Sequence, residues 1–170
     1  MIDKISRNYL AIESIEELKE ASINNSNYNL KLDKINDFQL NKFFYKQIGK
    51  KYRWVDRLQW TNQNWINYVS NKNLFTFVLK DKKDLVGYFE LIYHESKKEI
   101  EVAYFGILEE YFGQKLGGYL LSEAIKKSFT FNTQRVWAHT CSLDHQNALK
   151  NYIARGMKIF KSETLKTNFY

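Results

Sequence analysis

The sequence predicts an α+β fold, in which a mostly antiparallel β-sheet is followed by two late helices that pack on it. Three observations lead to this class. Three apolar and aromatic runs lie between residues 74 and 108, separated by short polar turns, as in an antiparallel meander. Apolar residues then recur at helical spacing from residue 118. A β run, a second helical pattern and a last β run complete the chain.

The N-terminal part of the chain has the weaker strand patterns. Residues 9–12 and 28–32 are short apolar runs that predict strands, and the Asn-rich residues 24–27 predict a loop between them. A helix is predicted over 38–48, because an Asp that can cap it precedes this stretch and a Gly follows it. A second short helix is predicted over 61–70, with its apolar residues on one side.

The middle of the chain predicts three consecutive strands. The first covers residues 74–79, and the polar residues 81–84 form the turn that follows it. The second covers 85–93 and the third 99–108, with a turn at the lysine pair 97–98.

In the last third of the chain, the spacing of apolar residues changes from a strand pattern to a helical pattern. Residues 118–129 predict a helix with a continuous apolar face, and 135–139 predict a short strand. Asp144 is positioned to cap a further helix that ends at Gly156. Residues 157–161 predict a last strand, followed by a polar tail.

Composition limits the class of protein. Apolar residues make up 44% and aromatic residues 16% of the chain, enough to bury a core, so a disordered scaffold is excluded. There is no Pro and one Cys, which excludes collagen-like and disulfide-framework proteins. Uncharged runs are too short to cross a bilayer, and acidic residues interrupt the N-terminal segment. We expect a single cytoplasmic domain over residues 1–170 that has no membrane partner.

The net charge of +7 has three interpretations. It can indicate nucleic-acid binding, a solvated lysine-rich surface, or attraction of an anionic small molecule that carries several phosphates. The lysines are scattered and no predicted helix concentrates them, so we expect no nucleic-acid partner.

The most informative segment is the Gly-rich junction at residues 110–121, EYFGQKLGGYLL. A strand leads into a short loop that enters a helix, and the first N–H groups of a helix have no partners within it. Together with the helix dipole, such an end can bind phosphate. The alternative is a turn that only redirects the chain.

Two segments of the chain resemble the GNAT family of acyl-CoA-dependent N-acetyltransferases. The family has an R/Q-x-x-G-x-G/A loop after its fourth core strand, and a later helix with a pattern like N-x-x-A-x-x-x-Y-x-x-x-G-F. The strand, loop and helix over 99–129 resemble the first, and Ala148, Tyr152, Gly156 and Met157 fall on the second. The chain is also similar to a bacterial subfamily with an AYFGL…GGxLL…RVWxHTCxLDH…ALxNYxxRGF signature. The resemblance implies a GNAT-like mixed sheet, mostly antiparallel, with helices on both faces and splayed central strands.

The sequence departs from the family pattern at three positions. Phe112 stands where the family has Arg or Gln, and Lys115 where it usually has its first Gly. His145 replaces the Asn of the later helix. The Lys115 side chain can crowd a pyrophosphate or can attract it.

The resemblance implies that acetyl-CoA is the cosubstrate, bound between the splayed strands and over the Gly-rich loop. A backbone N–H near Gly106 or Ile107 would face the thioester oxygen and stabilise the charge that develops there. The cofactor-binding residues implied in this way are Phe105, Gly106, Ile107, Leu108, Gly113, Gln114, Lys115, Leu116, Gly117, Gly118, His145 and Tyr152.

The resemblance also implies direct attack by an amine in a ternary complex, which requires an acid and a base. Tyr152 is the candidate acid, and a core tyrosine is the alternative interpretation. Glu101 is the candidate base, with Glu90 and Tyr104 as rivals, while a water relay or a neutral amine would make a base unnecessary.

Aromatic and polar residues in the first half of the chain are candidates for the acceptor side. They either wall a pocket for an amine or belong to the core. The candidate substrate-binding residues are Trp54, Arg57, Trp60, Tyr88, Glu90 and Tyr104.

Other chemistries fit less well. Cys141 has His139 and His145 nearby in sequence, but adjacency in sequence does not establish a catalytic geometry. With Asp144 these residues match no common zinc-site spacing, so we expect no metal. The sequence therefore predicts an N-acetyltransferase that acts on a primary amine of a small-molecule or peptide acceptor. The alternative is a catalytically weak acyl-CoA-binding sensor, and either protein could be a homodimer.

Overall fold

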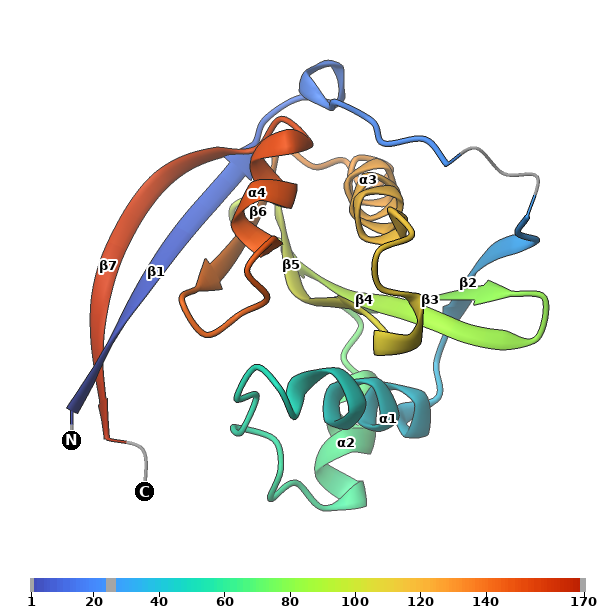
Figure 1. The fold of residues 1–170 in the computed structure, drawn as a ribbon, viewed down its shortest axis with the longest axis horizontal. Coiled ribbons are helices and arrows are strands. Elements are labelled where there is room, and N and C mark those ends of the chain that lie inside the picture. The colour runs from blue at the N-terminus through green and yellow to red at the C-terminus, as the bar shows by residue number, and fades with distance from the viewer. Residues whose placement is uncertain (1, 24–26, 169–170) are drawn as a thin grey trace.

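The computed structural model describes residues 2–23 and 27–168, and the predicted loop at 24–27 lies mostly outside this part. Seven strands form one sheet in the order β2-β3-β4-β5-β6-β1-β7 (Figure 1). All neighbouring strands are antiparallel except β5 and β6. The strands are β1 Ile2–Ile12, β2 Leu30–Ile35, β3 Leu74–Asp81, β4 Asp84–His94, β5 Glu99–Ile107, β6 Arg135–Cys141 and β7 Lys158–Asn168.

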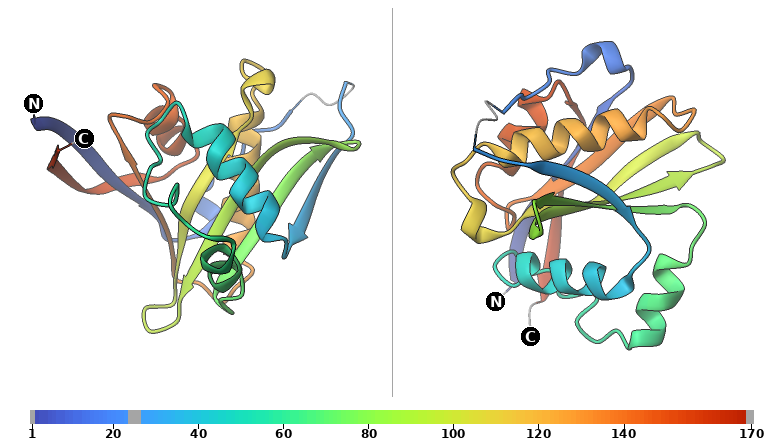
Figure 2. Two further views of the ribbon diagram at one scale, coloured as in Figure 1. Left: turned by 90° about the horizontal axis from the view of Figure 1, so that it is seen from below. Right: turned by 90° about the vertical axis from the view of Figure 1, so that its right-hand side faces the viewer.

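Helices cover both faces of the sheet, and Figure 2 (right) shows the sheet between the two layers. Helices α1 and α2 lie on one face, and α3 and α4 lie on the other (Figure 1). Two short 3₁₀ helices, η1 Ile15–Glu17 and η2 Glu109–Tyr111, precede β2 and α3. The α-helices are α1 Phe38–Gly49, α2 Asn62–Val69, α3 Leu116–Ser128 and α4 Ala148–Ala154.

The first two α-helices begin at side-chain caps. The Asp37 carboxylate accepts a hydrogen bond from the Gln39 amide, as the sequence predicts for this helix start. Thr61 caps α2 in a capping box, because the Asn64 amide donates to its hydroxyl and the Asn64 side chain accepts from the Thr61 amide. These caps fix where both helices start above β4 and β5.

The two central strands separate soon after they meet. Strands β5 and β6 pair only at three positions, Glu99 with Arg135, Ile100 with Val136 and Glu101 with Trp137. Beyond these pairs the strands diverge, and one edge of β5 has no strand beside it among the described residues. This confirms the predicted fold class: an α+β fold with a mixed, mostly antiparallel sheet, helices on both faces and splayed central strands.

A β-bulge in β5 sets which side chains face which helices. Glu90 pairs with Tyr104 and the next residue, Leu91, pairs with Val102, so Ala103 has no partner in β4. Because of this extra residue, the side chain of Tyr104 lies on the same face of the sheet as that of Glu90. Helices α1 and α2 cover this face.

The core has two parts, one on each face of the sheet. Residues of α3, with Tyr152 of α4 and Met157 just beyond it, pack on the inner strands and form the larger cluster. Phe44 and Ile48 of α1 pack with Val78, Tyr88 and Leu108 in the smaller one. The rings of Phe44 and Tyr88 stack with centroids 4.8 Å apart. The helical layers on both faces therefore pack on the same strands.

Three sequence-based expectations are wrong in detail. Strand β1 starts at Ile2, well before the predicted strand, because it pairs along its whole length with β7. The predicted polar tail is instead the second half of β7, which continues to Asn168. Asp144 does not cap α4, since its carboxylate accepts hydrogen bonds from the Thr140 hydroxyl and the Cys141 amide. In the part of the chain described here, no helix is both long and apolar enough to cross a membrane.

Candidate functional site

A cavity of about 1030 Å³ opens where β5 and β6 separate. One wall is β5 from Val102 to Ile107, and the opposite wall is the end of β6 from His139 to Cys141. The Gly-rich loop and the start of α3 close one end, together with α4. The segment between α1 and α2 contributes Arg53, Trp54 and Asp56 at the other end, and Tyr52 beside His145, with ring centroids 6.0 Å apart. The lining therefore differs in chemistry between the two ends.

The open edge of β5 presents backbone groups to the cavity. The Leu108 amide donates to the Val86 carbonyl of β4 at 2.8 Å, so this amide points away from the cavity. Amides alternate in direction along an antiparallel strand, and the amide of Ile107 therefore faces the gap, as does that of Phe105. Leu108 itself is buried and does not line the cavity.

The Gly-rich loop ends in a free helix start. Helix α3 begins at Leu116, and no side chain among the described residues caps it. Its N-cap, Lys115, has a left-handed backbone with φ 62° and ψ 11°, a conformation that favours glycine. Lys115 adopts this backbone in spite of its Cβ, at a position where a glycine would adopt it without strain. The first amides of α3 point into the cavity end lined by Gly113, Lys115, Leu116, Gly117 and Gly118.

Two side chains from α4 and its C-terminus pack against this helix start. The Asn151 amide donates to the Gly117 carbonyl at 3.2 Å. The guanidinium of Arg155 lies against Gly118, where a Cβ would collide with it and would also come 3.1 Å from the Ala21 Cβ. A residue with a Cβ at position 118 would therefore displace the Arg155 guanidinium.

This end of the cavity is basic. Lys115, Lys150 and Arg155 line it, which makes it suited to a ligand with several phosphates. Sequence reasoning missed Lys150, Asn151 and Arg155. The only signal was their position beside Tyr152 on a helix that returns to the Gly-rich loop.

Tyr152 lies at the centre of the cavity wall, buried against Phe105 with ring centroids 6.4 Å apart. Its hydroxyl has no hydrogen-bond partner among the described residues. Burial raises the pKa of the Tyr152 phenol, and the nearby Asp144 carboxylate adds to this effect. The hydroxyl is therefore a neutral donor that faces open space.

Of the other predicted cofactor-binding residues, some line the cavity and others do not. His145 lines the cavity, and its Nδ1 accepts a hydrogen bond from the Asn147 amide. Gln114 does not line it, because its side chain accepts from the Tyr28 hydroxyl and turns toward η2. Phe112 lines the cavity beside His145.

The far end of the cavity is aromatic and carries one exposed carboxylate. The rings of Trp54 and Tyr104 meet edge to face with centroids 4.9 Å apart, and both residues line the cavity. The Tyr104 hydroxyl donates to Asp56 at 3.0 Å. Asp56 also lines the cavity, and sequence reasoning passed over it because an Asp in a loop has no distinctive pattern.

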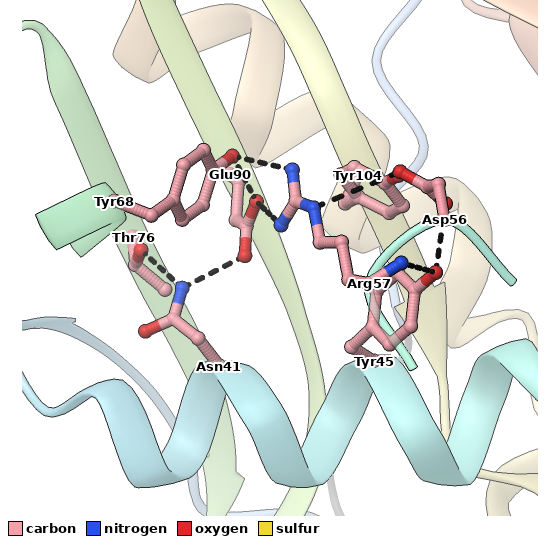
Figure 3. A network of polar contacts seen from close by, with 8 residues as sticks. All are labelled: Asn41, Tyr45, Asp56, Arg57, Tyr68, Thr76, Glu90 and Tyr104. Atoms are coloured by element: carbon pink, nitrogen blue, oxygen red, sulfur yellow. Dashed lines mark hydrogen bonds and ion pairs between the residues drawn. The ribbon is translucent and has the colours of Figure 1, made fainter. Parts of the chain in front are cut away.

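Two of the remaining predicted acceptor residues, Arg57 and Glu90, belong to the polar network of Figure 3. Glu90 is fully buried and accepts hydrogen bonds from Asn41 at 2.8 Å, Tyr68 at 2.7 Å and Arg57 at 3.2 Å. The Arg57 guanidinium lies over the rings of Tyr68 at 4.0 Å and Tyr104 at 4.1 Å, with Trp60 at 4.8 Å. Arg57, Trp60, Tyr88 and Glu90 do not line the cavity.

Glu101 also lies outside the cavity lining. Its carboxylate is 3.0 Å from Nε2 of His94, whose ring stacks on Trp137. A group at the cavity could exchange a proton with Glu101 only through an intervening water or side chain.

The residues considered for covalent or metal chemistry have other partners. Burial raises the pKa of the Cys141 thiol, which makes it a weak nucleophile. Over residues 2–23 and 27–168, no three His, Cys, Asp or Glu side chains are close enough to hold a metal ion.

Solved structures with this fold include several acetyltransferases. A GCN5-related N-acetyltransferase from Kribbella flavida is 15% identical with a TM-score of 0.69, over 97% of this chain and 59% of that one. One from Sphaerobacter thermophilus is 13% identical with a TM-score of 0.71, over 97% and 52%. An aminoglycoside acetyltransferase from an uncultured soil metagenomic sample, in complex with trehalose, is 14% identical with a TM-score of 0.64, over 85% and 97%. The chain thus spans between about half and nearly all of these proteins.

At such identities the structural likeness establishes the fold, and the family rests on sequence. No curated protein matches the chain significantly. The family model described as "Acetyltransferase (GNAT) family" matches residues 35–157, from the end of β2 to the residue before β7. This match covers well over half of the 170 residues and includes both segments that resemble the family patterns, so the chain belongs to the GNAT family of acetyltransferases.

Proposed function

We propose that this protein transfers an acetyl group from acetyl-CoA to a primary amine, by direct attack in a ternary complex. The observation that carries the proposal is the cavity between β5 and β6, which combines an open strand edge, a free helix start and a basic end. These features fit an elongated ligand with an amide-rich arm and several phosphates. The amides of Leu116, Gly117 and Gly118 would hold the diphosphate, helped by Lys115 and Arg155.

The chemistry can be assigned to a few groups of this chain. The amide of Ile107 would donate to the thioester oxygen and stabilise the negative charge that develops as the amine attacks. A C–N bond forms, the C–S bond breaks, and the nitrogen loses one proton. The Tyr152 hydroxyl would donate to the departing sulfur, which leaves as a thiolate or takes up a proton.

Removal of the proton from the amine does not need a direct base. Glu101, proposed from the sequence, lies outside the cavity lining and would act through a relay that includes His94 or water. An amine that binds in its neutral form, or that loses its proton to water, would react without Glu101.

One observation favours a second function, an acyl-CoA-binding sensor with little turnover. Lys115 occupies a left-handed N-cap at the proposed phosphate site, and its side chain competes for the space that a family glycine leaves open. If the ammonium holds the ligand too firmly, release of CoA would become slow.

The proposal is tested by melting the protein with and without acetyl-CoA, and by measuring CoA release with a panel of amines. A ligand at about one hundred times its Kd stabilises by about 2.7 kcal/mol, which raises the Tm by about 5–10 °C for a chain of this size. A shift with amine-dependent CoA release supports the acetyltransferase, and a shift without release supports the sensor. The absence of any shift contradicts both. Aminoglycosides belong in the panel, because a protein of similar fold is an aminoglycoside acetyltransferase.

A further inference from the structure

The carboxylate of Asp56 is held in place although it lies on a connecting segment. Its side chain is 64% exposed, yet both of its oxygens have hydrogen-bond donors. The Tyr45 hydroxyl donates to Oδ1 at 2.7 Å and the Tyr104 hydroxyl donates to Oδ2 at 3.0 Å (Figure 3). The two tyrosines come from different elements, α1 and β5, and their hydrogen bonds offset the entropy cost of holding an exposed carboxylate in one orientation.

The tyrosines themselves are immobile. Tyr45 is fully buried, and its oxygen also accepts a hydrogen bond from the backbone amide of Arg57 at 3.0 Å. Burial raises the pKa of both Tyr45 and Tyr104, so their hydroxyls keep the protons that they donate to Asp56. The carboxylate thus has one position relative to β5, on the edge of the cavity.

The charge of Asp56 is not cancelled by its neighbour Arg57. The guanidinium makes its closer ion pair with the buried Glu90 at 3.2 Å, while its Nε is 4.0 Å from Asp56. Arg57, Glu90 and Asp56 together carry one net negative charge, and Asp56 is the member that lines the cavity. The other acid in the lining of the described part, Asp144, is occupied by Thr140 and the Cys141 amide.

The cavity therefore has Lys115, Lys150 and Arg155 at the end proposed for phosphates, and a fixed carboxylate at the acceptor end, where Arg53 also contributes to the lining. We propose that Asp56 binds a second positive charge of the acceptor, so that the substrate class is a diamine or another amine with two cationic groups. This inference rests on the proposed function. One amine attacks the thioester while the other remains an ammonium ion against Asp56. The Trp54 ring also lines the cavity and is available to the same cation, whereas the Tyr104 ring already lies against the Arg57 guanidinium.

The spacing along β5 sets the size of this acceptor. Tyr104, which holds Asp56, is three residues from Ile107, whose amide is proposed to face the thioester. Three strand residues span roughly 10 Å, so amines separated by about five to seven carbon atoms fit between the two points.

The test compares α,ω-diaminoalkanes of about five to seven carbons, the length set by the roughly 10 Å span, with monoamines of equal length, as acceptors in a CoA-release assay. With the wild type we expect kcat/KM to be roughly five- to tenfold higher for the best diamine, since a charge-assisted contact at a partly exposed site has this magnitude. Asp56→Asn is expected to abolish that preference, mainly through KM, while the Kd of acetyl-CoA stays unchanged. Asp84→Asn, which removes an exposed carboxylate outside the cavity, is expected to keep it.

Each outcome is decisive for one of the two proposals. If acetyl-CoA raises the Tm but diamines show no preference, or show one that Asp56→Asn retains, the role of Asp56 is wrong and the proposed function stands. The same holds if no diamine supports CoA release while another amine does. If acetyl-CoA does not bind, the proposed function is wrong and this inference falls with it. A Tm measurement on Asp56→Asn shows whether loss of the preference reflects loss of the fold.

Discussion

The rings of Phe112 and His145 lie edge to face, with their centroids 5.3 Å apart. These are two of the three positions where the sequence departs from the family pattern, and they contact each other. An aromatic contact thus replaces the polar groups that the family usually has there, and it joins the Gly-rich loop to the turn before α4. The two departures from the family pattern therefore form one local contact, and helix α3 still begins at Leu116.

Gly117 and Gly118 give a matched pair of substitutions in the first turn of α3. In Gly118→Ala the new methyl displaces the Arg155 guanidinium, the flexible end of its side chain, and we expect a weaker affinity for acetyl-CoA with only a small drop in Tm. In Gly117→Ala the nearest atom is Asn151 Nδ2 at 3.8 Å, so this variant is expected to be as stable as the wild type or up to about 1 kcal/mol more stable. Thermal melts with and without acetyl-CoA check both. Equal behaviour of the two variants would contradict the role given to Gly118.

Lys115→Gly separates the backbone effect at the N-cap from the charge effect. Because a left-handed backbone strains any residue with a Cβ, we expect glycine to stabilise the free protein by about 1 kcal/mol. Loss of the ammonium is expected to raise the Kd of acetyl-CoA about threefold. Urea unfolding and ligand titration measure the two quantities. A tighter Kd would show instead that the side chain crowds the ligand.

Tyr152→Phe is expected to lower kcat about 100-fold with little change in the Kd of acetyl-CoA, because a positioned proton donor contributes this much to such reactions. The hydroxyl has no partner among the described residues, so the Tm of the free protein should not fall. CoA-release kinetics and a melt check this. An unchanged kcat would make Tyr152 a residue of the cavity wall only.

Glu90→Gln should be the most destabilising of the carboxylate-to-amide substitutions. It leaves the Arg57 guanidinium buried without its counter-ion, at a cost of about 3 kcal/mol in the free energy of unfolding. Glu20→Gln, which removes an exposed ion pair to Lys126, is expected to cost less than about 1 kcal/mol. Urea midpoints compare them, and similar losses in both would mean that the Arg57 network does not stabilise the fold.

His139 gives the protein a dependence on pH. Burial lowers the pKa of its imidazole, and the Arg7 guanidinium adds to this effect. Below about pH 6.5 the unfolded chain therefore binds a proton on this residue that the folded protein does not, and the free energy of unfolding falls as the pH drops through this range. His139→Gln should flatten that slope. Urea midpoints between pH 5 and 8 test this, and parallel slopes in the two proteins would exclude His139 as the cause.

The sequence predicts the local parts of the fold well and the long-range parts poorly. The meander β3–β5 and helix α3 have strong apolar patterns, so their positions are confirmed within a few residues. The second half of β7 has the polar sequence SETLKTN and is a strand only because β1 lies beside it. Its hydrogen bonds come from the other end of the chain, which no local pattern reveals.

In the candidate site, too, the sequence predicts the residues of local motifs well and those that depend on long-range contacts poorly. Gly117, Gly118 and Tyr152 are found from motifs, because each motif places residues of one segment. Asp56 and Arg155 enter the cavity from segments that only the folded chain brings there. Trp60 and Glu90 were candidates because their segments resemble the acceptor side of the family, but Glu90 is buried, Trp60 is half-buried, and neither lines the cavity.

The three residue pairs between β5 and β6 also have a mechanical meaning. They are the only strand pairing, over residues 2–23 and 27–168, between a four-stranded leaf, β2 to β5, and a three-stranded leaf, β6, β1 and β7. The two leaves are therefore held together mainly by the core that they share, which joins Leu10 and Val136 of one leaf to Phe89 and Val102 of the other. The free edge of β5 can accept a ligand in the gap without the loss of any strand pairing.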